Sequence, residues 1–196
     1  LVDHDLLSYK LYKIGVTGRL HTNIMRRYKN LTSCCTANGE TSSFFPVKVG
    51  TAQGCPLSPA LFNIFVQDLI DLLNAEKYCD ITLAYADDIV TISKTPQDMQ
   101  KLIDMCACWT CDWRMKANVK KSAVMEVLAN NAPKTQNSYK YNGEDVPVVK
   151  EYKYLGVIFD DKLNFIDSPN ALRFFMWSFH NAVNADVHAK NVHLVH

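Results

Sequence analysis

Two short apolar segments, residues 81–84 and 89–92, are separated by Tyr85-Ala86-Asp87-Asp88. Both segments are rich in β-branched side chains, which favour an extended backbone. Two such segments with a very short connection predict a pair of strands joined by a tight turn. The pattern therefore predicts a β-hairpin that carries two adjacent carboxylates at its turn.

A helical pattern of apolar positions precedes this hairpin, near residues 59–73. Its apolar residues recur every three or four positions and predict one buried helix face: Phe62, Phe65, Val66, Leu69, Ile70 and Leu73. Ser58 is a suitable N-cap, and Pro59 fits the first helical position. The preceding Gln53-Gly54 predicts a loop in which glycine lets the backbone approach a ligand closely.

A second helical pattern follows the hairpin over residues 96–113. Thr95 and Asp98 resemble a capping box at its start. Its apolar face consists of Met99, Leu102, Ile103, Cys106, Thr110 and Trp113. Because each helix has a single apolar face, both must bury that face on a common sheet. We therefore predict an α+β fold in which two helices back a small antiparallel sheet.

Shorter elements are predicted in the rest of the chain. Residues 123–128 predict a strand, and Asn142-Gly143 predicts a hairpin turn within residues 139–148. Ser168 and Pro169 begin a predicted helix. Its apolar face consists of Leu172, Phe175, Met176, Phe179 and Val183. We expect a core domain over residues 1–165 and a helical segment over residues 166–196.

The pair Asp87-Asp88 is the main candidate for chemistry. Adjacent carboxylates repel each other, and burial increases that cost unless a cation neutralises them. Mg²⁺ prefers oxygen ligands and usually binds through one or two carboxylates plus substrate phosphates. The turn thus indicates metal-assisted phosphoryl or nucleotidyl transfer. The alternative is an ordinary polar turn, because Asp is common in turns.

In their order along the chain, these motifs resemble the reverse transcriptases of non-LTR retrotransposons. The matching segments are Gln53-Gly54-Cys55-Pro56-Leu57-Ser58-Pro59, Tyr85-Ala86-Asp87-Asp88, Asn118-Val119-Lys120-Lys121-Ser122 and Tyr152-Lys153-Tyr154-Leu155-Gly156. The resemblance covers residues 1–165. It implies the palm of an RNA-directed DNA polymerase with incomplete fingers and thumb. Residues 166–196 would then be a packing helix or the start of a thumb, or they would come from an altered reading frame.

The resemblance also implies a role for each matching residue. Asp87 and Asp88 would be the catalytic metal ligands, for two Mg²⁺ ions in the complete enzyme. Because neighbouring strand side chains diverge, we expect Asp87 to be the main ligand and Asp88 a second or outer one. Nucleotide and template would lie against Gln53, Gly54, Tyr85, Lys120 and Lys121, and the hairpin at Tyr154, Leu155 and Gly156 would position the primer. The implied partners are an RNA template, a DNA primer and deoxynucleoside triphosphates.

The start of the chain departs from the family pattern. The family has a further carboxylate in a Phe-Asp-x-Val-x-His segment, and Val2 and His4 match its Val and His. The essential Asp would thus precede Leu1, and Asp3 and Asp5 are expected to be exposed residues after a strand. We therefore expect this chain to be inactive alone. Two alternatives stay open: a non-catalytic retroelement remnant that binds RNA weakly, and a reverse transcriptase of another lineage, such as an intron maturase.

Composition narrows the remaining classes. The 196 residues are 48% hydrophobic and 21% charged, which is typical of one folded domain. The net charge of +1 argues mildly against strong independent binding of nucleic acid, although Arg26-Arg27-Tyr28-Lys29 and Lys120-Lys121 are local basic clusters. No apolar run is long enough for a membrane span, and we expect an intracellular protein, nuclear or cytoplasmic. Cys106, Cys108 and Cys111 lack a fourth ligand at zinc-site spacing, which favours free thiols.

Overall fold

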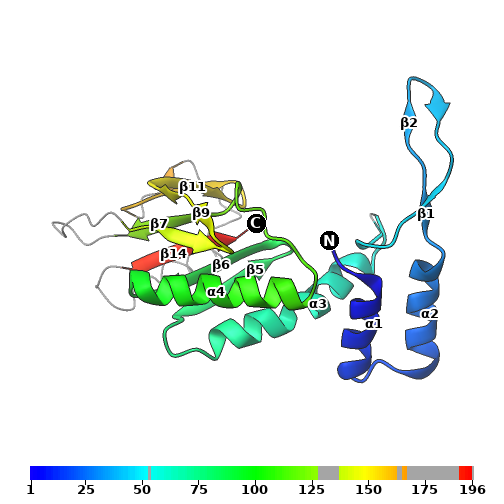
Figure 1. The fold of residues 1–196 in the computed structure, drawn as a ribbon, viewed down its shortest axis with the longest axis horizontal. Helices are drawn as coiled ribbons and strands as arrows, with labels where there is room; N and C mark the ends of the chain where they lie inside the picture. Colours follow the sequence, from blue (N-terminus) through cyan, green and yellow to red (C-terminus); the bar gives the residue numbers. More distant parts are fainter. Residues whose placement is uncertain (53, 128–136, 163–164, 167–189, 196) are drawn as a thin grey trace. The chain divides into compact units, whose positions relative to one another are not determined.

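A computed structural model describes residues 1–52, 54–127, 137–162, 165–166 and 190–195. The chain divides into two compact units (Figure 1). The first contains residues 1–68 and 110–116, and the second contains residues 69–109 and the chain from residue 117 onward. Two helices, α3 (Ser58–Asn74) and α4 (Pro96–Asp112), contribute to both units. No helix among the described residues is long and apolar enough to cross a membrane.

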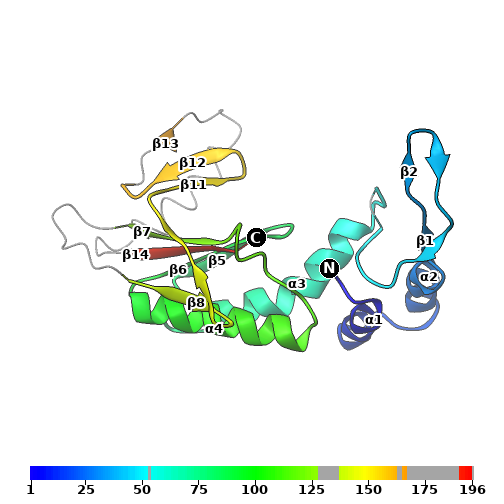
Figure 2. The same ribbon diagram turned by 45° about the horizontal axis from the view of Figure 1, so that its top comes forward.

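The first unit consists of helices followed by a narrow β-arm. Helix α1 is His4–Lys13 and α2 is Gly18–Lys29. In the arm, β1 (Thr32–Ser33) pairs antiparallel with β4 (Phe45–Pro46), and β2 (Thr36–Ala37) pairs antiparallel with β3 (Glu40–Thr41). Asn38 and Gly39 both have positive φ at the tip, as a type I′ turn requires. The arm begins where α2 ends and extends from it in both views (Figures 1 and 2).

A buried lysine holds the helices of this unit together. The Lys10 ammonium contacts the Phe65 carbonyl, lies 2.5 Å from an Asp68 carboxylate oxygen, and lies 3.7 Å from the centroid of the Trp113 ring. Burial lowers the pKa of Lys10, and Asp68 acts in the opposite direction. These partners satisfy a charge that would be costly to bury alone.

Asp3 begins α1 as its N-cap. Its Oδ1 accepts hydrogen bonds from the backbone N–H groups of Asp5 at 3.0 Å and Leu6 at 3.2 Å, and its Oδ2 lies 3.2 Å from Arg114 Nη1. Burial alone would raise the pKa of Asp3, but these hydrogen bonds outweigh it and lower the pKa. The expectation of a merely exposed residue is therefore wrong, because the carboxylate is engaged in capping. Asp5 is exposed, as expected.

Replacing this cap should destabilise the protein measurably. We expect Asp3→Ala to lower the free energy of unfolding by about 1 kcal/mol, because two backbone N–H groups lose their acceptor. Asp3→Asn retains an acceptor and should cost less. Because the folded-state pKa is lowered, the contribution is present above the ordinary value of 3.8 and is lost as the pH falls through the folded-state pKa. Urea unfolding measures both variants, and equal losses would contradict the capping role.

A five-stranded sheet organises the second unit. Its order is β10 (Val148–Val149), β7 (Ala123–Val127), β14 (Lys190–Val195), β6 (Asp88–Ser93) and β5 (Ile81–Tyr85). Neighbouring strands are antiparallel, except that β10 and β7 are parallel. Val192 of β14 pairs with Ile92 on one side and with Met125 on the other. A segment from the end of the sequence therefore forms the middle of the sheet.

Further layers cover the two faces of this sheet. Helix α4 and the second-unit part of α3 lie along one face, and the smaller sheet of β11 (Glu151–Tyr154), β12 (Val157–Asp160) and β13 (Phe165–Ile166) lies over the other (Figure 2). The two sheets share a buried cluster: Val90, Ile92, Met125, Tyr154, Val157 and Phe159. This packing fixes the smaller sheet against the strand that begins at Asp88.

Several predicted elements are confirmed. The hairpin of residues 81–92 and both predicted helices are present, and the fold mixes helices and sheets as an α+β fold does. Asn142 and Gly143 join β8 (Tyr139–Tyr141) to β9 (Glu144–Val146) at positive φ. Thr95 Oγ1 accepts a hydrogen bond from the Asp98 backbone N–H at 3.1 Å, which confirms the predicted cap.

The C-terminal prediction needs correction. The predicted helix that begins at Ser168 lies outside the described residues, but residues 190–195 form β14 and residues 165–166 form β13. The helical segment predicted over residues 166–196 is therefore wrong at residue 166 and at residues 190–195. Polar and apolar residues alternate from Asn191 to Leu194, a period that favours a strand. The boundary after residue 165 stays a prediction.

Candidate active site

The two carboxylates lie at the turn of the β5–β6 hairpin. Tyr85 ends β5 and pairs with Asp88, which begins β6, so Ala86 and Asp87 are the loop. Ala86 has a φ of 51°, and Asp87 is not at positive φ, which is the type II′ pattern that matches hairpin twist. Tyr85 is 64% exposed, Asp87 is exposed and Asp88 is partly buried. Both carboxylates are thus at an accessible end of the hairpin.

Because Ala86 has a positive φ, we expect the substitution Ala86→Gly to stabilise the protein. The left-handed region costs a non-glycine residue about 1 kcal/mol or more, and glycine avoids that cost. Glycine also gives the unfolded chain more conformational entropy, which offsets part of this gain, so we expect Ala86→Gly to raise the free energy of unfolding by about 0.5 kcal/mol. Ala84→Gly, on the adjoining strand, is the control and should destabilise. Chemical denaturation measures both, and a loss of stability in Ala86→Gly would contradict the strain.

Asp88 lies beside two tyrosines of the smaller sheet. Alternation along β6 places Asp88 on the same face as Val90 and Ile92, which pack against that sheet. The Tyr154 hydroxyl donates a hydrogen bond to the Asp88 carbonyl oxygen at 3.3 Å. Burial raises the pKa of Tyr152, and the negative charge of Asp88 raises it further. The turn is therefore held from one side by β11.

The hairpin of β11 and β12 has the geometry of a tight turn. Its loop residues Leu155 and Gly156 have φ angles of 48° and 86°, the type I′ pattern. Leucine is unusual at positive φ. Leu155 packs against the buried cluster shared by the two sheets, and this contact offsets the conformational cost. Tyr154 is only 4% exposed, so its ring lies inside this cluster.

Lys120 and Lys121 are exposed in the turn before β7. The Lys121 backbone N–H donates to the Asn118 carbonyl at 2.9 Å. The Tyr152 hydroxyl donates to the Lys121 carbonyl oxygen at 2.7 Å. The structure thus brings together three predicted groups: the carboxylate turn, the lysine turn and the β11–β12 hairpin.

Tyr152 was not among the predicted site residues, although it connects these groups. Its hydroxyl reaches the lysine turn, and its ring lies close enough to Asp88 for that charge to raise its pKa. Tyr152 and Tyr154 are two positions apart on β11, so they share a face of the strand. That spacing is the sequence signal that could have identified it.

The predicted loop before α3 belongs to the first unit. Gln53 lies outside the described residues. Gly54 has a φ of 81°, and no atom lies within 4 Å of the position that a Cβ would occupy. The thiol of the next residue, Cys55, lies 3.4 Å from Arg27 Nη1. Its pKa is lowered, first by a hydrogen bond from the Leu57 backbone and also by Arg27.

The turn supplies some, but not all, of the oxygen ligands that a hard divalent cation needs. Asp87 and Asp88 offer carboxylate oxygens, the ligands that such cations prefer. Within the described ranges, no cluster of three or more His, Cys, Asp or Glu side chains is arranged to hold a metal. The described residues can therefore supply two carboxylates, and water or phosphate oxygens would complete the coordination.

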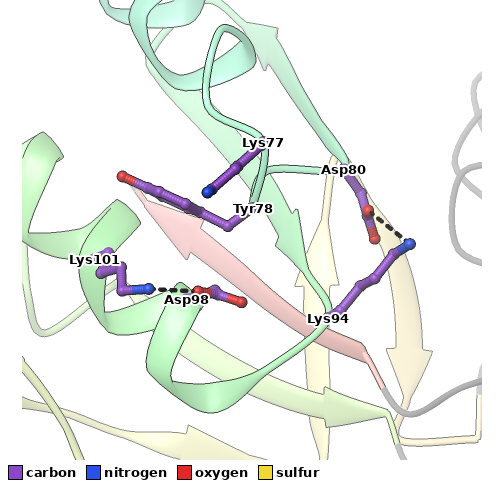
Figure 3. A pocket seen from close by; sticks show the side chains of 6 residues that line it. All are labelled: Lys77, Tyr78, Asp80, Lys94, Asp98 and Lys101. Atoms are coloured by element: carbon purple, nitrogen blue, oxygen red, sulfur yellow. Dashed lines mark hydrogen bonds and ion pairs between the residues drawn. The ribbon is translucent and has the colours of Figure 1, made fainter.

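A surface pocket of about 260 Å³ lies away from these residues, at the opposite end of the β5–β6 hairpin (Figure 3). It is lined by Lys77, Tyr78, Asp80, Lys94, Asp98 and Lys101. Lys101 pairs with Asp98 at 2.8 Å, and Lys94 pairs with Asp80 at 3.9 Å. Five strand residues span about 17 Å, so this pocket is separate from the carboxylate turn.

The chain is similar to a described family and to several known proteins. Residues 1–159 match the family described as reverse transcriptase (RNA-dependent DNA polymerase). The RNA-directed DNA polymerase from mobile element jockey of Drosophila funebris is 31% identical over 171 residues, which cover 83% of this chain and 18% of that protein. The Pol polyprotein from type-1 retrotransposable element R2 of Popillia japonica is 26% identical over 172 residues, which cover 81% of this chain and 28% of that protein.

The match thus spans only 18% and 28% of the length of these two relatives. Their names confirm the resemblance that the Gln53-Gly54 and Tyr85-Ala86-Asp87-Asp88 motifs indicated. The family match contains the whole first unit and every strand of the carboxylate-bearing sheet except β14. The chain belongs to the reverse transcriptase family, and its relatives are polymerases of non-LTR retrotransposons.

Proposed function

We propose that this chain forms the palm core of an RNA-directed DNA polymerase that adds deoxynucleotides to a primer on an RNA template. The carrying observation is the position of Asp87 and Asp88 at an accessible hairpin turn, with β11 anchored to the Asp88 backbone by Tyr154. A polymerase needs acidic groups beside the primer end, and this contact couples the acidic turn to the hairpin proposed to position the primer.

The metal in this proposal is Mg²⁺, held by Asp87 and Asp88. When bound, two such ions supply an activated primer hydroxyl and neutralise charge on the triphosphate. The chain itself contributes the rigid turn and the carboxylates. Asp87 is proposed as the main ligand because it is the more exposed of the two.

Other residues would contact substrates through exposed groups. Tyr85 ends β5 beside the carboxylate turn, and Lys120 lies in the turn before β7; both side chains are exposed. In the same turn, the Lys121 carbonyl oxygen accepts a hydrogen bond from the Tyr152 hydroxyl. Lysine ammonium groups suit triphosphate or template phosphates. Gly54, whose Cβ position is open, would let template or nucleotide approach the backbone.

Two parts of the β11–β12 hairpin would position the primer: the turn, which would contact it, and Tyr154, which would hold the turn in place. Tyr154 is buried, so it would act as a positioning residue by fixing the hairpin to Asp88. Leu155 and Gly156 form the turn itself and are more exposed than Tyr154. They are the parts of this hairpin that a primer strand could reach.

The test is DNA synthesis by a chimera in which this chain replaces the matching segment of the Drosophila funebris jockey polymerase. Extension of an oligo(dT) primer on poly(rA), dependent on Mg²⁺, is expected. A folded chimera that extends no primer, while the parent polymerase does, would contradict the proposal and favour a non-catalytic remnant.

A further inference from the structure

Positive charge is concentrated in one part of the first unit. Residues 16–57 contain five basic residues and one acidic residue, a formal charge of +4, whereas the whole chain carries +1. The basic residues are Arg19, Arg26, Arg27, Lys29 and Lys48, and the acidic residue is Glu40 near the tip of the arm. The near-neutral total therefore conceals a basic segment, and a basic segment favours a polyanionic partner.

Two exposed aromatic rings lie within this basic segment. Phe44 is 72% exposed and Phe45 is 43% exposed. Phe45 pairs with Ser33 at the base of the arm, and the Val47 N–H donates to the Leu31 carbonyl at 2.8 Å. These pairings return the chain to the end of α2, where Arg26, Arg27 and Lys29 lie. The backbone pairing at the base of the arm thus brings the segment that carries the rings back to the end of α2, whose last turn carries the cations; β1 follows α2 directly in Figure 1.

The same surface is continuous with the loop before α3. Arg27 contacts the thiol of Cys55, the residue after Gly54. A ligand that follows the basic end of α2 would therefore reach the loop assigned above to nucleotide and template. We name the set Arg26, Arg27, Lys29, Phe44, Phe45 and Lys48 the arm patch.

We propose that the arm patch binds single-stranded RNA. Unpaired bases stack on exposed aromatic rings, while basic side chains contact the phosphates, and this combination is characteristic of single-strand binding. Two rings alone are too small for the apolar core of a stable protein interface, and the surrounding cations suit a polyanion. Only the identification of this RNA as the template rests on the proposed function.

Equilibrium binding tests the aromatic part. The 196-residue chain is titrated into a fluorescein-labelled 12-nucleotide oligo(U) without divalent metal or nucleotide, and anisotropy is recorded. Phe44→Ala should weaken binding about tenfold, because it removes a ring on which one base stacks. Tyr12→Ala removes an equally exposed ring (65%) from α1 and should bind as the unchanged chain does. A duplex RNA of the same length should bind more weakly and should be insensitive to Phe44→Ala.

Salt dependence tests the charged part. Each phosphate contact contributes a slope of about −0.7 in a plot of log affinity against log salt. Arg26→Gln with Lys29→Gln should reduce the magnitude of this slope by about 1.4, whereas Lys150→Gln, in the other unit, should leave it unchanged. Phe44→Ala should weaken binding without changing the slope.

The outcomes separate this inference from the polymerase proposal. Unchanged RNA affinity in Phe44→Ala, or equal losses in Phe44→Ala and Tyr12→Ala, would overturn the arm patch even where the chimera makes DNA. The patch would then be a surface that another part of a longer polypeptide covers. Tenfold weaker binding in Phe44→Ala supports the patch even where the chimera makes no DNA, because this assay contains no metal or nucleotide.

Discussion

Asp87→Asn should reduce RNA-directed DNA synthesis by the jockey chimera at least 10³-fold, on the order of 4 kcal/mol of transition-state stabilisation. The substitution removes one negative charge and one oxygen ligand from the exposed end of the turn. It preserves the size of the side chain, so the hairpin geometry is retained. Asp88→Asn should cost less, because Asp88 is proposed as the second or outer ligand.

The controls separate this loss from unfolding. Asp145→Asn replaces an exposed carboxylate on β9 in the same unit and should leave DNA synthesis unchanged. The melting temperature of Asp87→Asn should equal or exceed that of the unchanged chimera, because removing one of two neighbouring negative charges relieves repulsion. Equal primer extension by Asp87→Asn and the unchanged chimera would show that the metal assignment is wrong.

Local patterns predicted the elements near the candidate site. The β-branched flanks of Tyr85-Ala86-Asp87-Asp88 determine a hairpin, and the apolar stripes from Phe62 and from Met99 determine helices, because these signals depend on neighbouring residues. The Asn142-Gly143 turn is equally local. The order of the motifs then indicated the family, which the comparisons confirm.

Long-range pairing was not predictable in the same way. Strand β14 lies between β6 and β7, about a hundred residues from one of its partners. Nothing in a window of ten residues specifies such a partner. The buried Lys10 is a second example, because its partners Phe65, Asp68 and Trp113 come from distant segments. A lone lysine in a helix pattern predicts a solvent-exposed side chain.

The candidate site residues were named one by one from motifs, whereas the contacts between them were not predicted. Asp87, Asp88 and Lys121 were named from motifs, whereas the Tyr152 contact with Lys121 and the Tyr154 contact with Asp88 are tertiary. Tyr154 was assigned to primer positioning, and its burial shows how such a role would operate. A buried ring cannot touch a primer, but it can fix the hairpin that is proposed to touch one.

Tyr154→Ala should destabilise the protein by about 3–5 kcal/mol, because it removes a large ring from a packed cluster. The ring lies among Val90, Ile92 and Phe159 and joins the smaller sheet to β6. Tyr154→Phe keeps the ring and removes the hydroxyl that donates to the Asp88 carbonyl, so we expect a cost of about 1 kcal/mol. Urea unfolding followed by circular dichroism measures both. A loss below 1 kcal/mol in Tyr154→Ala would show that the two sheets do not depend on this contact.

The same tyrosine should make stability depend on alkaline pH. Burial, with a further contribution from Asp88, raises the pKa of Tyr154 above its ordinary value of 10.0. Above pH 10 the unfolded chain therefore loses this proton while the folded chain keeps it, and the free energy of unfolding falls as the pH rises. Tyr154→Phe should flatten this decline between pH 10 and 11. An unchanged decline in Tyr154→Phe would mean that Tyr154 ionises equally in both states, and the hydroxyl would then not be buried against the Asp88 backbone.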